Sequence, residues 1–334
     1  MIRHANVSLV RWLVALCIGA MALVGCSDEW FETTEVPLTN IISGGPGGTW
    51  YAMGSAIADR TNDHFQGHPI TAVPGAGAVS NPARVARVPG DMGMSYLNLL
   101  RLAYEGQPPY GEAFSELRLI AVLTENKLHL LISDALEVDS LPQLMDIRGV
   151  SIGTGNPGSN EEHVMRLLLE ESGMTYDDIT DRGGRVNLLG TGERVGSWKD
   201  RHLDIINFTI NDPAPAVSEL MVSRPSRIWS LPDDLRQAMV RNHGYRMSTI
   251  APNTYPGQTE EVRTIGDVAV LFATADLDEE IVYAVAKTIA ENKLYLETVH
   301  PSFVDWDPSN LPEDAGVPFH DGAARYYLER GWIE

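Results

Sequence analysis

Short apolar runs alternate with stretches of helical periodicity from Leu38 to the end of the chain. Turns rich in Gly, Pro or Asn separate the two kinds of segment. This alternation predicts an α/β fold on mainly parallel sheets. The apolar runs predict strands at 38–43, 70–73, 92–96, 117–123, 128–133, 150–153, 185–189, 204–210, 228–231 and 262–274. The amphipathic stretches predict helices that include 51–62, 81–88, 161–172, 214–222 and 278–299.

Two segments divide these elements into two predicted lobes. Residues 117–133 hold two apolar runs with only Thr124-Glu125-Asn126-Lys127 between them, and residues 262–274 form another long β-like run. A length of 334 residues also exceeds what one hydrophobic core usually serves. We expect the chain to leave one lobe near residue 126 and to return near 264. The expected lobes are lobe I, 38–126 plus 264–334, and lobe II, 127–263.

The first residues have the pattern of an export signal. Arg3, His4 and Arg11 precede the apolar run 12–24, which is shorter than the roughly 20 residues that span a bilayer. The sequence Leu-Val-Gly-Cys then places Cys26 where a lipobox carries its lipid. We expect residues 1–25 to be a lipoprotein signal peptide, Cys26 to be lipidated and 26–37 to be a tether. A plain signal peptide or a single membrane anchor stays open as the alternative.

Charge and cysteine content narrow the possible partners. The chain carries a formal net charge of −20 with a pI near 4.8, which argues against nucleic acid and against docking on anionic lipid through a basic patch. Cleavage before Cys26 leaves 309 residues with one cysteine, so no internal disulfide is expected. Because Arg3 and Arg11 leave with the signal, the expected mature charge is −22.

A glycine-rich loop at 43–51 precedes the first predicted helix. The sequence Ser-Gly-Gly-Pro-Gly-Gly-Thr-Trp-Tyr lets backbone approach a ligand, and the helix start offers unpaired N–H groups to a carboxylate or another small anion. The alternative is a flexible strand-to-helix connection. Ser80, Tyr96 and Asn98 occupy comparable strand ends in the same expected lobe.

Two further loops follow strands of the second expected lobe. Residues 153–160 match G-x-G-x-x-G, but Pro157 stiffens the turn and an exported protein seldom meets NAD, so we favour an anion-binding helix start over a dinucleotide site. At 210–215, Asn211 and Asp212 stand at a strand end. Helix capping by Asp212, with Pro213 at the first helical position, and ligand contact are both open there.

Catalytic and metal-binding motifs are missing from the sequence. It contains no G-x-S-x-G, H-E-x-x-H or Walker loop, and its nine His show no ligand spacing. No pair of carboxylates stands out as an acid/base couple. We therefore expect no catalytic residue, no metal site, no cofactor and no enzymatic activity.

Five blocks in order give the chain a resemblance to the TAXI family, the extracytoplasmic solute-binding proteins of TRAP transporters. They are ISGGPGGTWYAMG (42–54), the Gly-Asn-Pro-Gly-Ser turn (155–159), Pro213-x-Pro215, IAPNTYPGQ (250–258) and PFHDGAARYY (318–327). The resemblance spans the expected mature chain. It implies a two-lobed, type II periplasmic-binding-protein-like fold, in which two mainly parallel sheets are flanked by helices and the lobes close over a small ligand in the cleft between them.

The resemblance also implies the ligand-binding positions. By position these are Gly47, Gly48, Thr49, Trp50, Tyr51, Ser80, Gly158, Ser159, Asn211 and Asp212. Four more positions at the expected cleft are Tyr96, Asn98, Asn126 and Asn160. They depart from the family pattern, as do Asn211 and Asp212, which replace small residues. These departures concern the identity of the ligand more than the fold.

The function that this resemblance implies is solute capture outside the cytoplasm. The expected ligand is a small organic anion, such as a glutamate-like or dicarboxylate solute, and the expected partner is a TRAP permease driven by an ion gradient. We expect a lipid anchor to tie the protein to a membrane. The alternatives are a receptor for an ATP-driven importer, a sensor, or an extracytoplasmic enzyme on the same scaffold.

Overall fold

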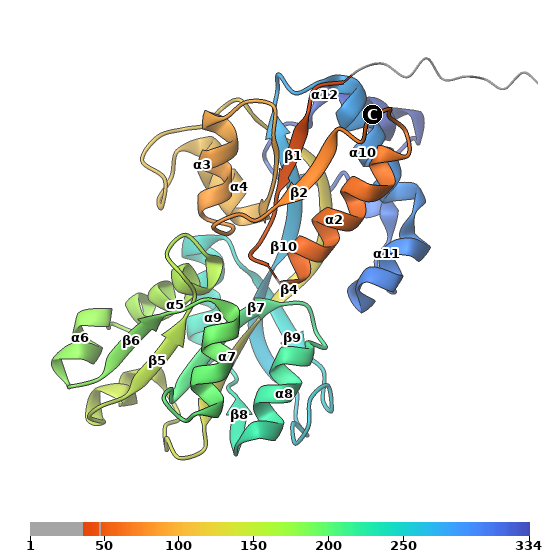
Figure 1. Cartoon of the computed structure of the whole chain (residues 1–334). Coiled ribbons are helices and arrows are strands. Elements are labelled where there is room, and N and C mark those ends of the chain that lie inside the picture. Colours follow the sequence, from red (N-terminus) through yellow and green to blue (C-terminus); the bar gives the residue numbers. More distant parts are fainter. Residues whose placement is uncertain (1–35, 47) are drawn as a thin grey trace, which may run out of the picture. The chain divides into compact units, whose positions relative to one another are not determined.

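The computed structural model describes residues 36–46 and 48–334. The predicted signal peptide, the lipidation site Cys26, most of the tether and Gly47 therefore lie outside the described residues. Within the described residues, strands and helices alternate along the chain, which confirms the α/β prediction (Figure 1).

The strands of the described chain join into one ten-stranded sheet. Its order is β2-β1-β3-β10-β4-β7-β5-β6, with β8 paired to β4 and β9 paired to β10. The strands are β1 Thr39–Ile42, β2 Ile70–Val73, β3 Met92–Tyr96, β4 Leu117–Ser133, β5 Ser151–Thr154, β6 Arg185–Leu188, β7 Ile205–Ile210, β8 Ser226–Ile228, β9 Arg246–Ile250 and β10 Val262–Thr274.

Helices follow or connect these strands. The α-helices are α2 Thr49–Asn62, α3 Ser80–Arg87, α4 Leu97–Glu105, α5 Asn160–Glu171, α6 Tyr176–Asp181, α7 Thr191–Lys199, α8 Pro215–Ser223, α9 Asp233–His243, α10 Glu279–Glu291, α11 Lys293–Val299 and α12 Asp321–Glu329. Three short 3₁₀ helices are η1 Leu141–Asp146, η2 Pro301–Phe303 and η3 Pro308–Asn310.

Two long antiparallel strands hold the sheet together. Strands β1, β2 and β3 are parallel to one another, as are β5, β6 and β7, and β10 and β4 lie between the two groups (Figure 1). We predicted two separate sheets, but β4 pairs with β10 over most of its length and also with β7. Because β10 also pairs with β3 of the first group, the two predicted sheets are one.

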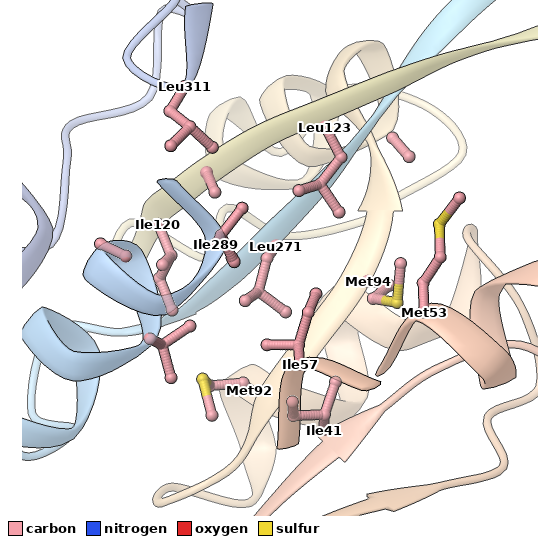
Figure 2. Close-up of a cluster of buried hydrophobic side chains, with 14 of the residues drawn as sticks. Ile41, Met53, Ile57, Met92, Met94, Ile120, Leu123, Leu271, Ile289 and Leu311 are labelled. Atoms are coloured by element: carbon pink, nitrogen blue, oxygen red, sulfur yellow. The ribbon is translucent and has the colours of Figure 1, made fainter. Parts of the chain in front are cut away.

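Alternate residues of the first group of strands enter two different cores. Ile41 faces a cluster with α2 and α10, whereas the next residue, Ile42, faces a cluster with α3 and α4. This alternation is the period of two that a strand buried on both faces requires. Figure 2 shows the first of these clusters, in which side chains of the sheet and of the covering elements point toward one another.

The second group of strands is also covered on both faces. Ile132 and Ile205 lie in a cluster with residues of α5 and α9, and Leu131 and Ile206 lie in a cluster with residues of α7 and α8. The described chain therefore has one pair of buried clusters on each side of the shared strands.

Three element predictions were wrong in detail. The strand expected at 228–231 is β8, Ser226–Ile228, and shares only one residue with the prediction. The polar stretch 124–127 does not interrupt β4, because Asn126 and Lys127 pair with Asp267 and Gly266 of β10. The expected helix 278–299 is broken between α10 and α11. There the Asn292 side chain donates to the Thr288 carbonyl (2.9 Å), a local bond of the kind that favours helix ends over helix interiors.

Candidate functional site

Strand-to-helix loops at one edge of each parallel group carry most of the predicted site. Parallel strands end at the same edge of a sheet, so the loops that follow them lie close together. The first group presents the loops that begin α2, α3 and α4. The second group presents the loops that begin α5, α7 and α8.

The two sets of loops meet at Gly158. Its carbonyl oxygen accepts hydrogen bonds from the N–H groups of Val79 (3.1 Å) and Ser80 (3.2 Å) at the start of α3. A Cβ on Gly158 would overlap Ser80 Oγ, and a Cβ on Gly77 would lie 2.7 Å from Ser159 Cα. Both glycines also have positive φ angles, +89° and +127°. This close approach requires glycine at both positions. It brings the predicted residues Ser80, Gly158 and Ser159 together.

The glycine-rich loop ends at the start of α2. Gly48 is the N-cap residue, with an extended backbone (φ −87°, ψ 155°), and no side chain caps the helix. Thr49 and Tyr51 stand half-buried in the first turn. A helix start without a capping side chain leaves N–H groups for another acceptor, and an anion suits them best.

An aromatic pair joins this loop to the shared strands. The rings of Trp50 and Tyr96 lie 4.8 Å apart, both side chains are buried, and Trp50 Nε1 has no hydrogen-bond partner among the described residues. Tyr96 Oη accepts from Asn126 Nδ2 (2.8 Å) and donates to the Thr209 carbonyl (3.3 Å). Burial, with the nearby Glu161 carboxylate, raises the Tyr96 pKa well above its usual value, so the hydroxyl keeps its proton.

Asn160 extends this network on the other side of Thr209. Its Nδ2 donates to Thr209 Oγ1 (3.0 Å), and its Oδ1 accepts from Tyr245 Oη (3.1 Å). The structure therefore brings the predicted residues Tyr96, Asn126 and Asn160 into one buried network. Tyr245 was not predicted, because it lies in the turn between α9 and β9, away from any strand-end loop.

Asn98 lies in the first turn of α4, where hydrogen bonds hold it to β10 and to the last residue of α9. Its backbone N–H donates to Asp267 Oδ2 (3.1 Å), and its Nδ2 donates to the His243 carbonyl (3.2 Å). Burial raises the pKa of the Asp267 carboxyl to about 7, and the two backbone N–H groups that it accepts from, with Arg246 and Arg101 at longer range, oppose this rise. A titratable group thus lies inside one of the two shared strands.

Asn211 and Asp212 contact β4. Asn211 Nδ2 donates to Thr124 Oγ1 (3.0 Å) and to the Glu125 carbonyl (2.5 Å). Asp212 forms a half-buried ion pair with Lys127 (3.0 Å).

The suggestion that Asp212 caps the next helix is wrong. The N-cap of α8 is Ala214, no side chain caps this helix, and the proline of its first turn is Pro215.

One buried basic residue of this edge was missed. Arg194 of α7 is 2% exposed, and its guanidinium lies over the Phe208 ring, 4.6 Å from the ring centroid. The signal in the sequence was its spacing of four from Trp198, which is fully buried, because this spacing places both side chains on one face of a helix. Gly192 and Gly196 weakened the helical pattern that would have revealed it.

Neither a metal-binding cluster nor a membrane-spanning helix is present in the described part of the chain. Residues 36–46 and 48–334 contain no group of three or more His, Cys, Asp or Glu side chains arranged to hold a metal ion. None of the helices in these residues has both the length and the apolar character to span a bilayer.

The chain matches one family model and several solved structures. The model of the NMT1-like family matches residues 41–331. MatC from Rhodopseudomonas palustris, solved with bound malate, is 14% identical with a TM-score of 0.53, over 89% of this chain and 96% of MatC. The periplasmic binding protein BugD is 10% identical with a TM-score of 0.53, over 90% of this chain and 96% of BugD. These likenesses confirm the two-lobed, periplasmic-binding-protein-like fold.

Proposed function

The chain belongs to the NMT1-like family, and we propose that it is an extracytoplasmic receptor that captures a small organic anion between its lobes. A binding role, not catalysis, fits a site built from helix starts and amide side chains. MatC carries malate on a similar fold, and this supports an organic acid as the ligand. BugD, a periplasmic binding protein, supports a place outside the cytoplasm.

A set of buried polar atoms where the loops converge carries the proposal. Trp50 Nε1, a donor, and the Oδ1 atoms of Asn126 and Asn211, both acceptors, have no hydrogen-bond partner among the described residues. Trp50 packs on Tyr96, Tyr96 bonds Asn126, and Asn211 bonds the backbone of the residue next to Asn126. Buried polar atoms are nearly always paired, so these atoms indicate a ligand that both accepts and donates.

A ligand screen tests this function. We expect carboxylates or amino acids to stabilise the purified protein, by roughly 2.7 kcal/mol at a concentration of 100 times Kd. Thermal unfolding reads this shift, and mass spectrometry identifies any solute that copurifies. If no member of a broad carboxylate and amino-acid panel shifts the unfolding temperature and nothing copurifies, the receptor function is contradicted. Turnover of a copurified solute would instead indicate an enzyme.

Within this function we propose the TAXI type of receptor, with a TRAP permease as partner. The five sequence blocks support this assignment. Reconstitution with a candidate permease in liposomes tests it, because uptake should need an ion gradient and no ATP. Uptake that requires ATP would identify a receptor of an ATP-driven importer.

We also propose that a lipid on Cys26 anchors the protein. The Leu-Val-Gly-Cys sequence after an apolar run supports the anchor. Cys26→Ala should release the protein into the soluble fraction. A variant that stays with the membrane would contradict the lipid anchor.

We propose further that the lobes are residues 38–126 plus 264–334 and residues 127–263. Within β4, Leu123 packs in the first pair of clusters and Leu128 in the second. Within β10, Ile265 still packs in the second pair and Val268 in the first, so the change of cluster falls just after the proposed bound at 264. The short stretches between these residues are then the hinge. Hydrogen exchange tests this division. The ligand should protect backbone N–H groups on both lobes and should change exchange within the four buried clusters little.

A further inference from the structure

Arg194 lies at the edge of the second lobe where the ligand loops gather. It is in the second turn of α7, which starts directly after β6 at the edge shared with the starts of α5 and α8. Side chains of a helix point back toward its N-terminus. The hydrogen bond from Arg194 Nη2 to Thr191 Oγ1 (3.4 Å) agrees with this direction. The guanidinium therefore extends toward the loops and not away from them.

The guanidinium is buried without an acidic partner. Arg194 is 2% exposed, and its Nε and Nη1 atoms are buried with no hydrogen-bond partner among the described residues. No carboxylate of the described chain forms an ion pair with it. The carboxylate of Glu161 is near enough to act on its pKa but does not reach hydrogen-bond distance.

Another buried arginine of the same lobe has partners for its guanidinium. Arg224 is 8% exposed, stacks on Trp198 and donates from Nη1 to the carbonyls of Trp198 (3.3 Å) and Leu203 (2.9 Å). Its role is to hold these backbone groups in place. Arg194 has the deeper burial and the fewer partners, so packing alone does not account for its charge.

A buried charge without a partner is costly, and a guanidinium cannot escape the cost by losing its proton. Contact with the Phe208 ring offsets only part of the cost. An anion beside Nε and Nη1 would complete the set of hydrogen bonds. Carboxylates are the commonest planar anions that match a guanidinium.

We infer that Arg194 binds a carboxylate group of the ligand and thereby selects organic acids over their neutral analogues. This inference rests on the proposed receptor function and names the residue that recognises the charge. The helix start at Gly48 lies on one lobe and the guanidinium of Arg194 on the other. A dicarboxylate, or an amino acid with an acidic side chain, can therefore place one carboxylate against each of them.

The test uses Arg194→Met, which keeps most of the length and removes the charge. Calorimetry would measure the affinities of succinate and L-glutamate and of their neutral-ended analogues, succinamate and L-glutamine. We expect the wild type to favour the acids, and Arg194→Met to lose about 10- to 100-fold in affinity for them while its affinity for the analogues changes less than threefold. Arg224→Met is the matched control and should keep the wild-type preference.

Unfolding of the ligand-free proteins distinguishes recognition from support of the fold. Because Arg194→Met removes an unpaired buried charge, its unfolding temperature should equal or exceed that of the wild type, whereas Arg224→Met should unfold earlier. Loss of stability in Arg194→Met comparable to that in Arg224→Met would overturn the inference. So would unchanged affinity of Arg194→Met for the acids, with the receptor function intact. A wild type that binds none of the four solutes and fails the broader screen contradicts the receptor function itself.

Discussion

Two glycines of one loop face different surroundings at the residue scale. A Cβ on Gly48 would lie 3.2 Å from the Gly45 carbonyl oxygen, beside the uncapped start of α2, whereas a Cβ on Gly45 would have no atom within 4 Å. A larger side chain at position 48 therefore covers the start of α2, whereas one at position 45 extends into open space. The same loop thus supplies a variant and its control.

Gly48→Val should reduce ligand affinity at least tenfold, because the side chain blocks access to the N–H groups of α2. The free energy of unfolding should fall by only about 1 kcal/mol, since valine is a poorer N-cap residue than glycine. Titration calorimetry and urea unfolding measure the two effects. Gly45→Val should bind normally, and equal affinities of the two variants would show that this helix start does not contact the ligand.

Asp267 makes stability depend on pH. Its folded pKa of about 7 lies above the usual 3.8 of an aspartate, so its contribution to stability is complete below about pH 4 and is lost as the pH rises to about 7. This group should lower the free energy of unfolding by about 4 kcal/mol across that window. His129 and His163, whose pKa values burial lowers to about 4, change stability in the opposite direction.

The variant Asp267→Asn isolates this group from the histidines. Urea unfolding of both proteins from pH 4.5 to 8 should show the wild type losing stability relative to the variant as the pH rises. A difference between the two proteins that stays constant with pH would mean that Asp267 does not titrate in this range.

At the scale of elements, burial decided which parts of the fold could be predicted. Strands β3 and β10 match the predicted ranges because nearly all of their residues are buried, and the apolar run 268–273 marks most of β10. Helix α7 was not predicted, and Arg194 was missed with it. Tyr245 joins the site only through a tertiary contact with Asn160, which no local pattern reveals.

Contact between the start of α3 and the loop before α5 should determine how well the lobes close. Gly158→Ala places a methyl group against Ser80 Oγ at a residue with φ of +89°. We expect affinity for the ligand to fall at least tenfold, because closure contributes to binding. The ligand should also no longer reduce the radius of gyration in X-ray scattering.

Gly173 provides the matched control for this contact. Its φ is +76°, so Gly173→Ala carries similar backbone strain, but its Cβ meets no atom within 4 Å. This variant should lose stability as Gly158→Ala does and keep the wild-type affinity. If both variants lose affinity equally, strain and not lobe contact is the cause.

At the scale of the whole molecule, the net charge opposes the proposed ligand. A chain with a net charge of −20 repels an organic anion at long range, so the attraction must come from local groups such as helix starts and Arg194. Salt screens the long-range field more than it screens a buried charge.

We therefore expect the association rate constant of a dicarboxylate to rise, about two- to tenfold, between 10 and 300 mM NaCl. Stopped-flow measurement of tryptophan fluorescence, which Trp50 should report, gives this rate. Arg194→Met should keep the same salt dependence, and a rate that falls with salt would show that positive groups near the cleft outweigh the acidic surface during approach.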